Sequence, residues 1–215
     1  MCSRYETMSD DELARAVAVG DIRAIVEKFE RSKRRDVYPR QFAPVLRIVN
    51  GQLIAEQMHW SLIPFWLKDT TPDGRPRLKM NTHNARADRI VDAPTFRGPW
   101  KRSQRCLIPL AAWYEPRRGI GQKGWLRISA SVPVMMFAGI WDTWHSPGVA
   151  EPVRSFSIIT TEPAPSIAQV HDRMPVRIVE SQRAAWLDES TPADTVIGML
   201  QPVEDDYTVE PARAA

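Results

Sequence analysis

The chain has 215 residues, of which 43% are hydrophobic and 26% are charged, and its formal net charge is +3. This length accommodates one large domain or two small ones, and the composition is that of an ordinary water-soluble globular protein. No stretch approaches the roughly 18 apolar residues of a membrane span, and no apolar leader opens the chain, so we expect a cytoplasmic protein without a membrane partner.

The cysteines, histidines and arginines of the chain indicate which metal, disulfide and phosphate-binding sites it can form. Cys2 and Cys106 do not make a disulfide framework, and neither is spaced from the four histidines as zinc ligands are. We therefore expect no metal and no organic cofactor. Arginines outnumber lysines by 23 to 6. Arginine suits phosphate contacts and base stacking, although a GC-rich genome explains the excess equally well.

The predicted elements change from helices to short strands along the chain. A capping box at Ser9–Glu12 predicts a first helix, and apolar residues at helical spacing predict a second helix over 22–29. The Asn50–Gly51 pair predicts a tight hairpin between strands. The strand candidates cover residues 45–49, 52–60, 106–109, 113–114, 125–128, 134–140 and 155–160.

Two irregular loops, residues 64–86 and 163–175, interrupt the strands, and short helices are predicted at 181–187 and from 191 onward. Short strands with few helices predict a single α+β domain over residues 1–200, with a curled, mostly antiparallel sheet and peripheral helices. Residues 201–215 are expected to form a C-terminal tail.

Cys2 is the first candidate for chemistry, because loss of Met1 would leave it with a free α-amine beside its thiol. These groups ordinarily titrate at about 7.7–8.0 and about 8.5, so near neutral pH a useful fraction of the amine is unprotonated and the thiolate is reachable with modest local help. An aminothiol adds to an aldehyde twice, first as an imine and then as a thiazolidine ring. The alternative is a cysteine without a role in a frayed terminus.

Further polar and aromatic candidates follow in short motifs. Trp113 and Tyr114 could desolvate Glu115 and raise its pKa. Each candidate also has a structural explanation, namely a loop-ordering pair, a strand-end ion pair, a cap or a core side chain. The remaining candidates are Asn84, Arg86, His171 and Trp66.

Taken in order, these motifs resemble those of the SOS response-associated peptidase (SRAP) family of abasic-site processing proteins. The resemblance covers roughly residues 1–200. Its segments are residues 1–5, 42–44, 60–66, 84–86, 106–109, 113–115, 139–141, 156–161 and 171–175. The chain departs from the family pattern at Ser3, Gln41, Leu67 and Pro116, which bear on the shape of the DNA groove.

The resemblance implies covalent capture of abasic sites in single-stranded DNA during the SOS response, as an autopeptidase with lyase-like DNA activity. It implies that Cys2, after self-removal of Met1, forms a thiazolidine with the ring-opened sugar. Asn84 would hold the Cys2 amine, Glu115 would act as general acid and base, and His171 would bind the sugar oxygen and transfer a proton.

The same resemblance implies the DNA contacts. Arg4 and Arg86 would bind flanking phosphates, and Trp66 would stack on a neighbouring base. We expect a monomer whose partner is single-stranded DNA, associated with the nucleoid when bound. Two alternatives remain: a Cys2-dependent peptidase or amidohydrolase acting in trans, and a non-covalent single-strand binding module in which Cys2 is dispensable.

Overall fold

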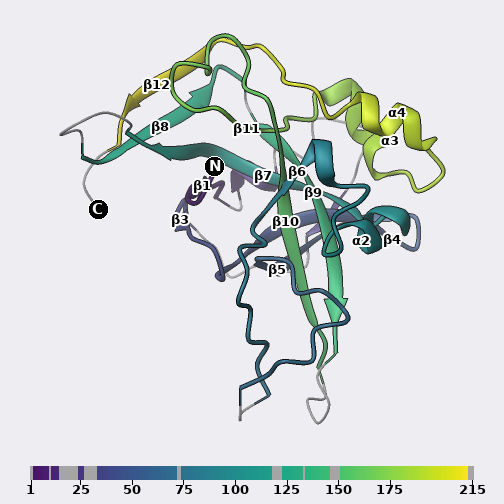
Figure 1. Ribbon diagram of the computed structural model, residues 1–215. Coiled ribbons are helices and arrows are strands. Elements are labelled where there is room, and N and C mark those ends of the chain that lie inside the picture. The colour runs from purple at the N-terminus through teal and green to yellow at the C-terminus, as the bar shows by residue number, and fades with distance from the viewer. Residues whose placement is uncertain are drawn as a thin grey trace.

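The computed structural model describes residues 2–9, 11–14, 24–26, 33–71, 74–117, 123–132, 134–145 and 151–212. Most of the regular structure is strand, and the helices are short (Figure 1). The strands are β1 (Tyr5–Thr7), β2 (Ala24–Val26), β3 (Asp36–Val37), β4 (Phe42–Val49), β5 (Gln52–Trp60), β6 (Asn84–Arg86), β7 (Arg105–Pro116), β8 (Trp125–Ala130), β9 (Met135–Trp144), β10 (Val153–Thr161), β11 (Met174–Pro175) and β12 (Tyr207–Pro211). The named helices are η1 (Ala87–Arg89), α2 (Arg97–Lys101), η2 (Glu180–Gln182), α3 (Arg183–Leu187) and α4 (Ala193–Gly198).

The sheet closes on itself into a barrel. Going round the ring, β5 pairs with β4, β4 with β7, β7 with β9, β9 with β10, and β10 returns to β5. Within this ring only the β10–β5 pairing is parallel. A closed ring has no unpaired edge, so its backbone groups are satisfied without a partner chain. The predicted strand-rich α+β fold with a curled, mostly antiparallel sheet is confirmed.

Shorter strands pair with the strands of the ring, and several of the polar motifs lie on them or directly before them. β1 and β8 pair with β7, and β6 and β11 pair with β10. Since β7, β9 and β10 are consecutive neighbours in the ring, segments far apart in sequence are brought to one side of the barrel.

The hairpin between β4 and β5 follows the sequence prediction. Asn50 and Gly51 have φ angles of 51° and 75°, as a two-residue turn with positive φ at both positions requires. The turn fixes the register from Val49 opposite Gln52 to Phe42 opposite His59.

Two apolar clusters fill the molecule. One includes buried aromatic side chains from five strands, and in it the ring of Trp113 meets the ring of Phe137 edge-on at 5.4 Å. The other packs the opposite side of the sheet against the short helices, with Trp186 of α3 fully buried and Val196 of α4 beside it. The helices are therefore peripheral, as predicted, but they complete a core.

Of the two helices predicted near the N-terminus, the structure confirms the cap of the first and contradicts the second. The capping box is confirmed, since the backbone N–H of Ser9 donates to Glu12 Oε2 at 2.9 Å and the N–H of Glu12 donates to Ser9 Oγ at 3.3 Å. The helix predicted over 22–29 is wrong where it can be assessed, because Ala24–Val26 forms β2 beside β5. A short apolar run with β-branched Ile25 and Val26 suits a strand as well as a helix. The rest of that prediction lies outside the described residues.

The C-terminal segment expected as a tail contributes to the sheet. β12 pairs antiparallel with β8, from Tyr207 opposite Ala130 to Pro211 opposite Leu126. The preceding loop is tied down by an ion pair between Arg177 and Asp205 at 2.7 Å. Within the described residues, no helix combines the length and apolar character that crossing a membrane requires.

Candidate active site

Cys2 lies inside the molecule because the strand that follows it is paired. β1 runs antiparallel to β7 with Tyr5 opposite Trp113, and the N–H of Tyr114 donates to Arg4 O at 2.9 Å. Cys2 is 0% exposed, and its Sγ lies 3.6 Å from the Arg4 carbonyl oxygen. Cys2 therefore does not lie in a frayed terminus.

Asn84 binds directly to Cys2. It opens β6, whose parallel pairing with β10 sets Asn84 opposite Ile158. The Asn84 Nδ2 group donates to the Cys2 carbonyl oxygen at 2.7 Å. The other amide atom, Oδ1, is buried and has no hydrogen-bond partner among the described residues. A buried acceptor of this kind is costly to leave unpaired, so Oδ1 is suited to bind a donor that enters the site.

Glu115 and His171 form the second half of the site. Glu115 lies near the end of β7 and is 0% exposed, and its Oε2 atom is 3.6 Å from His171 Nε2. That separation exceeds a normal hydrogen bond. It is nevertheless short enough for the two groups to exchange a proton after a small movement, or through a reactant that lies between them. His171 is held at the end of a turn, where its N–H donates to Ile167 O at 3.1 Å.

The other ring nitrogen of His171 has two neighbours of opposite character. The backbone N–H of Arg173 donates to Nδ1 at 3.0 Å, and Asp172 Oδ1 lies 2.8 Å from the same atom. A neutral ring accepts the Arg173 N–H and carries its proton on Nε2, facing Glu115. A charged ring donates from Nδ1 to Asp172, which is 73% exposed. Both protonation states are thus accommodated in one ring position, a feature that the sequence motif alone did not reveal.

The thiol of Cys2 is kept neutral. Burial raises its pKa well above the usual range, the Glu115 charge raises it further, and backbone hydrogen bonds at Arg4 and Tyr114 only partly oppose the rise. The surroundings of the thiol therefore do not provide the local help that thiolate formation near neutral pH needs, because the thiol is desolvated and lies near the Glu115 carboxylate. Its chemistry requires a base.

The two arginines predicted to bind phosphate differ in availability. Arg4 is buried, its Nη2 lies 2.5 Å from Asp36 Oδ2, and its guanidinium lies 4.1 Å above the Tyr114 ring. Arg86 is exposed and pairs with Asp88 at 2.7 Å, in a surface ion pair that a phosphate can replace at little cost. Contact between Arg4 and a phosphate requires its internal pair to open.

Trp66 is on the surface, as the sequence suggested, with 42% of its area exposed beside the still more exposed Phe65. The loop that carries both rings is held to β9 by a hydrogen bond, in which Trp144 Nε1 donates to Leu67 O at 2.8 Å. The Arg102 guanidinium lies 5.4 Å from the centre of the Phe65 ring. A fixed loop with outward aromatic rings can stack on a planar partner without prior ordering.

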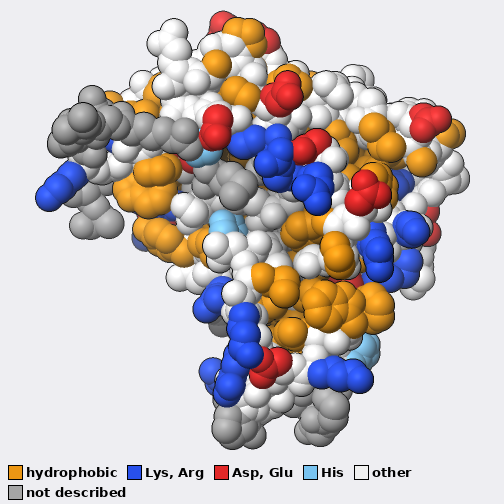
Figure 2. Space-filling model, viewed as in Figure 1, with side chains coloured by type: hydrophobic (Ala, Val, Ile, Leu, Met, Phe, Trp, Pro, Cys, Tyr) orange, Lys and Arg blue, Asp and Glu red, His pale blue; other side chains and the backbone are white. Residues whose placement is uncertain are grey.

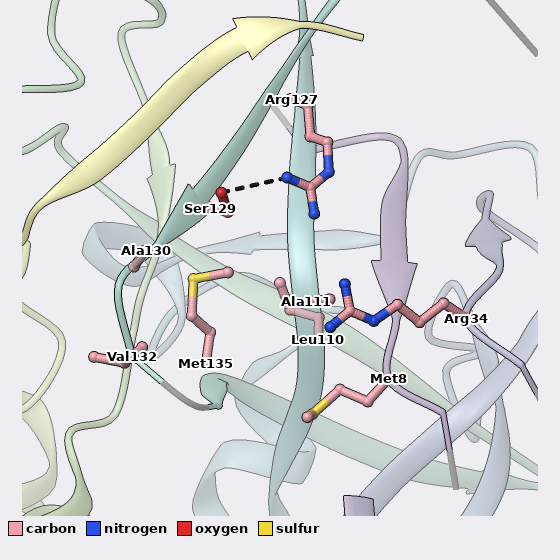
Figure 3. A pocket seen from close by; sticks show the side chains of 9 residues that line it. All are labelled: Met8, Arg34, Leu110, Ala111, Arg127, Ser129, Ala130, Val132 and Met135. Atoms are coloured by element: carbon pink, nitrogen blue, oxygen red, sulfur yellow. Dashed lines mark hydrogen bonds between the residues drawn. The ribbon is translucent and has the colours of Figure 1, made fainter. Parts of the chain in front are cut away.

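A small pocket of about 180 Å³ lies apart from these residues, at the Thr7–Leu110 end of the β1–β7 pair (Figure 3). Two guanidinium groups point into it, from Arg34 and Arg127. Arg34 is paired with Glu12, and Arg127 with Glu6 and Glu210, so the pocket offers no excess positive charge to an anion. Its lining is Met8, Arg34, Leu110, Ala111, Arg127, Ser129, Ala130, Val132 and Met135.

Among the described residues, no group of three histidine, cysteine or acidic side chains lies close enough together to hold a metal ion. The residues brought together are a thiol, an amide, a buried carboxyl group and an imidazole, which are groups that can serve in nucleophilic and acid–base chemistry.

Comparisons with known proteins place the chain among close structural relatives. The sequence model described as "SOS response associated peptidase (SRAP)" matches residues 1–214. The abasic site processing proteins YoaM and YoqW of Bacillus subtilis are 32% and 30% identical to it, each over 96% of this chain and over 88% and 89% of their own lengths. A crystal structure of a protein from Bacteroides thetaiotaomicron superposes with a TM-score of 0.82 at 25% identity, covering 99% of this chain and 92% of that one.

Proposed function

Because the chain belongs to the SOS response associated peptidase (SRAP) family, we propose that it processes abasic sites in DNA by capturing the opened sugar covalently through Cys2. The observation that supports this most is the 2.7 Å hydrogen bond from Asn84 to the Cys2 carbonyl. This bond holds Cys2 close enough to Glu115 for the carboxylate charge to act on the thiol, and Glu115 Oε2 in turn lies 3.6 Å from His171 Nε2. This proximity supports a reaction of Cys2 assisted by the two side chains.

The first step uses the amine that removal of Met1 exposes. The Cys2 nitrogen attacks the aldehyde carbon of the ring-opened sugar, and the carbinolamine loses water to form an imine. His171 with its proton on Nε2, or protonated Glu115, supplies the proton to the departing oxygen. The Asn84 oxygen, which is buried without a described partner, accepts a hydrogen bond from the Cys2 nitrogen or the sugar.

The second step uses the neutral thiol. Sulfur bonds to the imine carbon, the C=N π bond breaks, and the S–H proton ends on the nitrogen, so the five-membered ring closes without any oxidant or cofactor. Since the thiol does not ionise by itself, Glu115 is the group that removes its proton as the C–S bond forms. The same residues, in the reverse direction, would open the ring.

Met1 removal is the third part of this proposal. The Cys2 thiol would lose its proton to Glu115 and attack the Met1 carbonyl carbon, so that a thioester forms, the Met1–Cys2 C–N bond breaks and the Cys2 amine takes up the proton. Water would then hydrolyse the thioester, releasing methionine and restoring the thiol, and this would account for the peptidase in the family description. The chain would then act on its own terminus and not on peptides in trans.

The DNA is single-stranded in this proposal. Trp66 stacks on a base beside the abasic nucleotide, and Arg86 exchanges Asp88 for a phosphate. A buried nucleophile is reached only by a sugar that has no base and can enter the site, which provides selectivity for abasic positions without reading sequence.

The test is an oligonucleotide with one abasic site, incubated with the protein and run on a denaturing gel after boiling. A heat-stable adduct that disappears in Cys2→Ala supports the proposal. An adduct that persists in Cys2→Ala would contradict it, and so would specific DNA binding with no adduct. Hydrolysis of a peptide in trans without any adduct would favour the peptidase alternative.

A further inference from the structure

Between the exposed aromatic loop and Asn84 the chain makes an excursion that projects from the barrel (Figure 1). We call its described part, residues 68–71 and 74–79, the basic ribbon. Thr70 and Pro76 form an antiparallel bridge across it, and the N–H of Arg77 donates to Asp69 O at 2.9 Å. The ribbon is tied to the body where Arg40 Nη2 donates to Leu78 O at 3.1 Å. It is therefore an ordered, paired structure.

The ribbon presents positive charge on one face. Within residues 74–79, Arg75, Arg77 and Lys79 are exposed, whereas residues 74, 76 and 78 between them are partly buried. This alternation is the one that extended backbone produces, with alternate residues on the same face about 6.6 Å apart. Lys68, in the segment that precedes the turn, is also exposed. Figure 2 shows Lys and Arg side chains in a row on the projecting lobe, next to a hydrophobic patch on the same face.

The acidic partner within the described ribbon does not neutralise this face. Asp69 lies 2.8 Å from Lys79 Nζ and 4.0 Å from Arg77 Nε, and the Lys79 side chain is 74% exposed. Solvent-exposed ion pairs of this kind contribute about 0–1 kcal/mol, so an incoming phosphate can replace the carboxylate.

Chain continuity keeps the ribbon next to the candidate active site. Lys79 precedes Asn84 by five residues, which span at most about 18 Å when fully extended. Lys68 follows Trp66 by two residues. A strand that stacks on Trp66 and places one nucleotide at Cys2 therefore continues within reach of the ribbon.

We propose that the basic ribbon binds the phosphate backbone of single-stranded DNA on one side of the abasic nucleotide, extending the length of strand that the protein holds. This inference rests on the proposed function, because it assumes a strand already seated at Cys2. Its chemistry is that of a sequence-independent polyanion contact, in which each phosphate neutralised releases counterions.

The experiment compares Arg77→Gln/Lys79→Gln with a matched control, Lys33→Gln/Lys123→Gln, which removes the same charge from exposed positions outside the ribbon. Binding to an intact single-stranded oligonucleotide is measured at several salt concentrations. Two lost phosphate contacts should reduce the slope of log Kobs against log salt by about 1.4, and the control should leave the slope unchanged. An equal reduction in both variants, or none in the ribbon variant, would overturn the proposal.

Oligonucleotides with one abasic site then give the position of the contact. Shortening one flank should remove the difference between parent and ribbon variant, whereas shortening the other flank should preserve it. A difference that survives both truncations would contradict a contact on one side.

The two proposals fail separately. If the parent forms no adduct but the salt slope still changes in the ribbon variant alone, the ribbon binds DNA and covalent capture is wrong. If the parent forms the adduct and the slope does not change, capture stands and the ribbon proposal is wrong. At saturating DNA, the ribbon variant should form the adduct at the parent rate.

Discussion

Replacing Asn84 tests whether the N-terminal residue must be held for the reaction to occur. Asn84→Ala removes the donor that lies 2.7 Å from the Cys2 carbonyl and leaves that carbonyl buried without it. Leaving a buried acceptor unpaired costs about 1–3 kcal/mol, equivalent to a factor of about 5–150 in the population of the bound arrangement. We expect the rate of adduct formation at saturating DNA to fall by that factor.

The cost of leaving the Cys2 carbonyl unpaired should also lower the free energy of unfolding of Asn84→Ala. For a domain of this size each 1 kcal/mol lowers the melting temperature by about 2–4 °C, so Asn84→Ala should melt about 2–12 °C below the parent. Adduct formation is followed by quenching into detergent and separating free from crosslinked oligonucleotide. Binding to intact DNA should change little, because Asn84 contacts Cys2 and not the ribbon or Trp66.

Asn84→Asp is the matched variant, since it keeps the shape and replaces the donor by a carboxylate oxygen facing the Cys2 carbonyl. It should be slower than Asn84→Ala at neutral pH, because like partial charges then meet at the distance of a hydrogen bond. On acidification the protonated carboxyl regains a donor, so Asn84→Asp should recover relative to the parent at the same pH and Asn84→Ala should not. Parent-like rates and melting temperature in Asn84→Ala would refute the positioning role.

Three further predictions follow from buried or paired groups. Glu115→Gln should slow adduct formation or its reversal by about 10²–10⁴-fold while leaving binding to intact DNA unchanged, and a gel time course with normal rates in both directions would reduce Glu115 to a structural side chain. Inserting one alanine between Met1 and Cys2 should abolish the boil-stable adduct, because the nitrogen of Cys2 then belongs to an amide and cannot form an imine. Intact-mass analysis identifies the N-terminal residue of the variant. An adduct as stable as that of the parent would exclude thiazolidine formation. The Arg34 hydrogen bonds lower the pKa of Glu12 from its ordinary 4.5 to about 2, so its contribution to stability is complete above about pH 4.5 and is lost as the pH falls toward 2. Melting curves of Glu12→Gln should lack that part of the acid dependence, and identical curves would show that the pair contributes nothing.

Local rules predicted the parts of the fold that neighbouring residues determine. Asn50–Gly51 specifies its turn through backbone conformations that few residues adopt, and Ser9 with Glu12 specifies a cap within one helical turn. The strand at Ala24–Val26 was missed because a short apolar run has no distinct period, and its pairing with β5 decides its conformation.

The candidate site also has a part that the sequence predicted and a part that it did not. The order of its motifs was readable, but the environment of each side chain depends on contacts across the fold. Asp36 carries no motif, yet it holds Arg4 in a buried pair. Burial of the Cys2 thiol near Glu115 follows from the β1–β7 pairing, which no local pattern encodes, and it raises the pKa of the thiol where the sequence suggested that modest local help could lower it. The two neighbours of His171 Nδ1 emerge only from the conformation of its turn.

The pairing of β1 with β7 also sets the order of events during synthesis. Arg4 leaves the ribosome early, but its partner Tyr114 follows about 110 residues later, which takes about 5–20 s at ordinary translation speeds. Throughout that interval Met1 and Cys2 belong to an unpaired segment open to cellular aminopeptidases. The self-processing proposed above could begin only after β7 has been made and the barrel has closed. If Met1 is removed, cellular aminopeptidases therefore have access to it before the chain's own site exists.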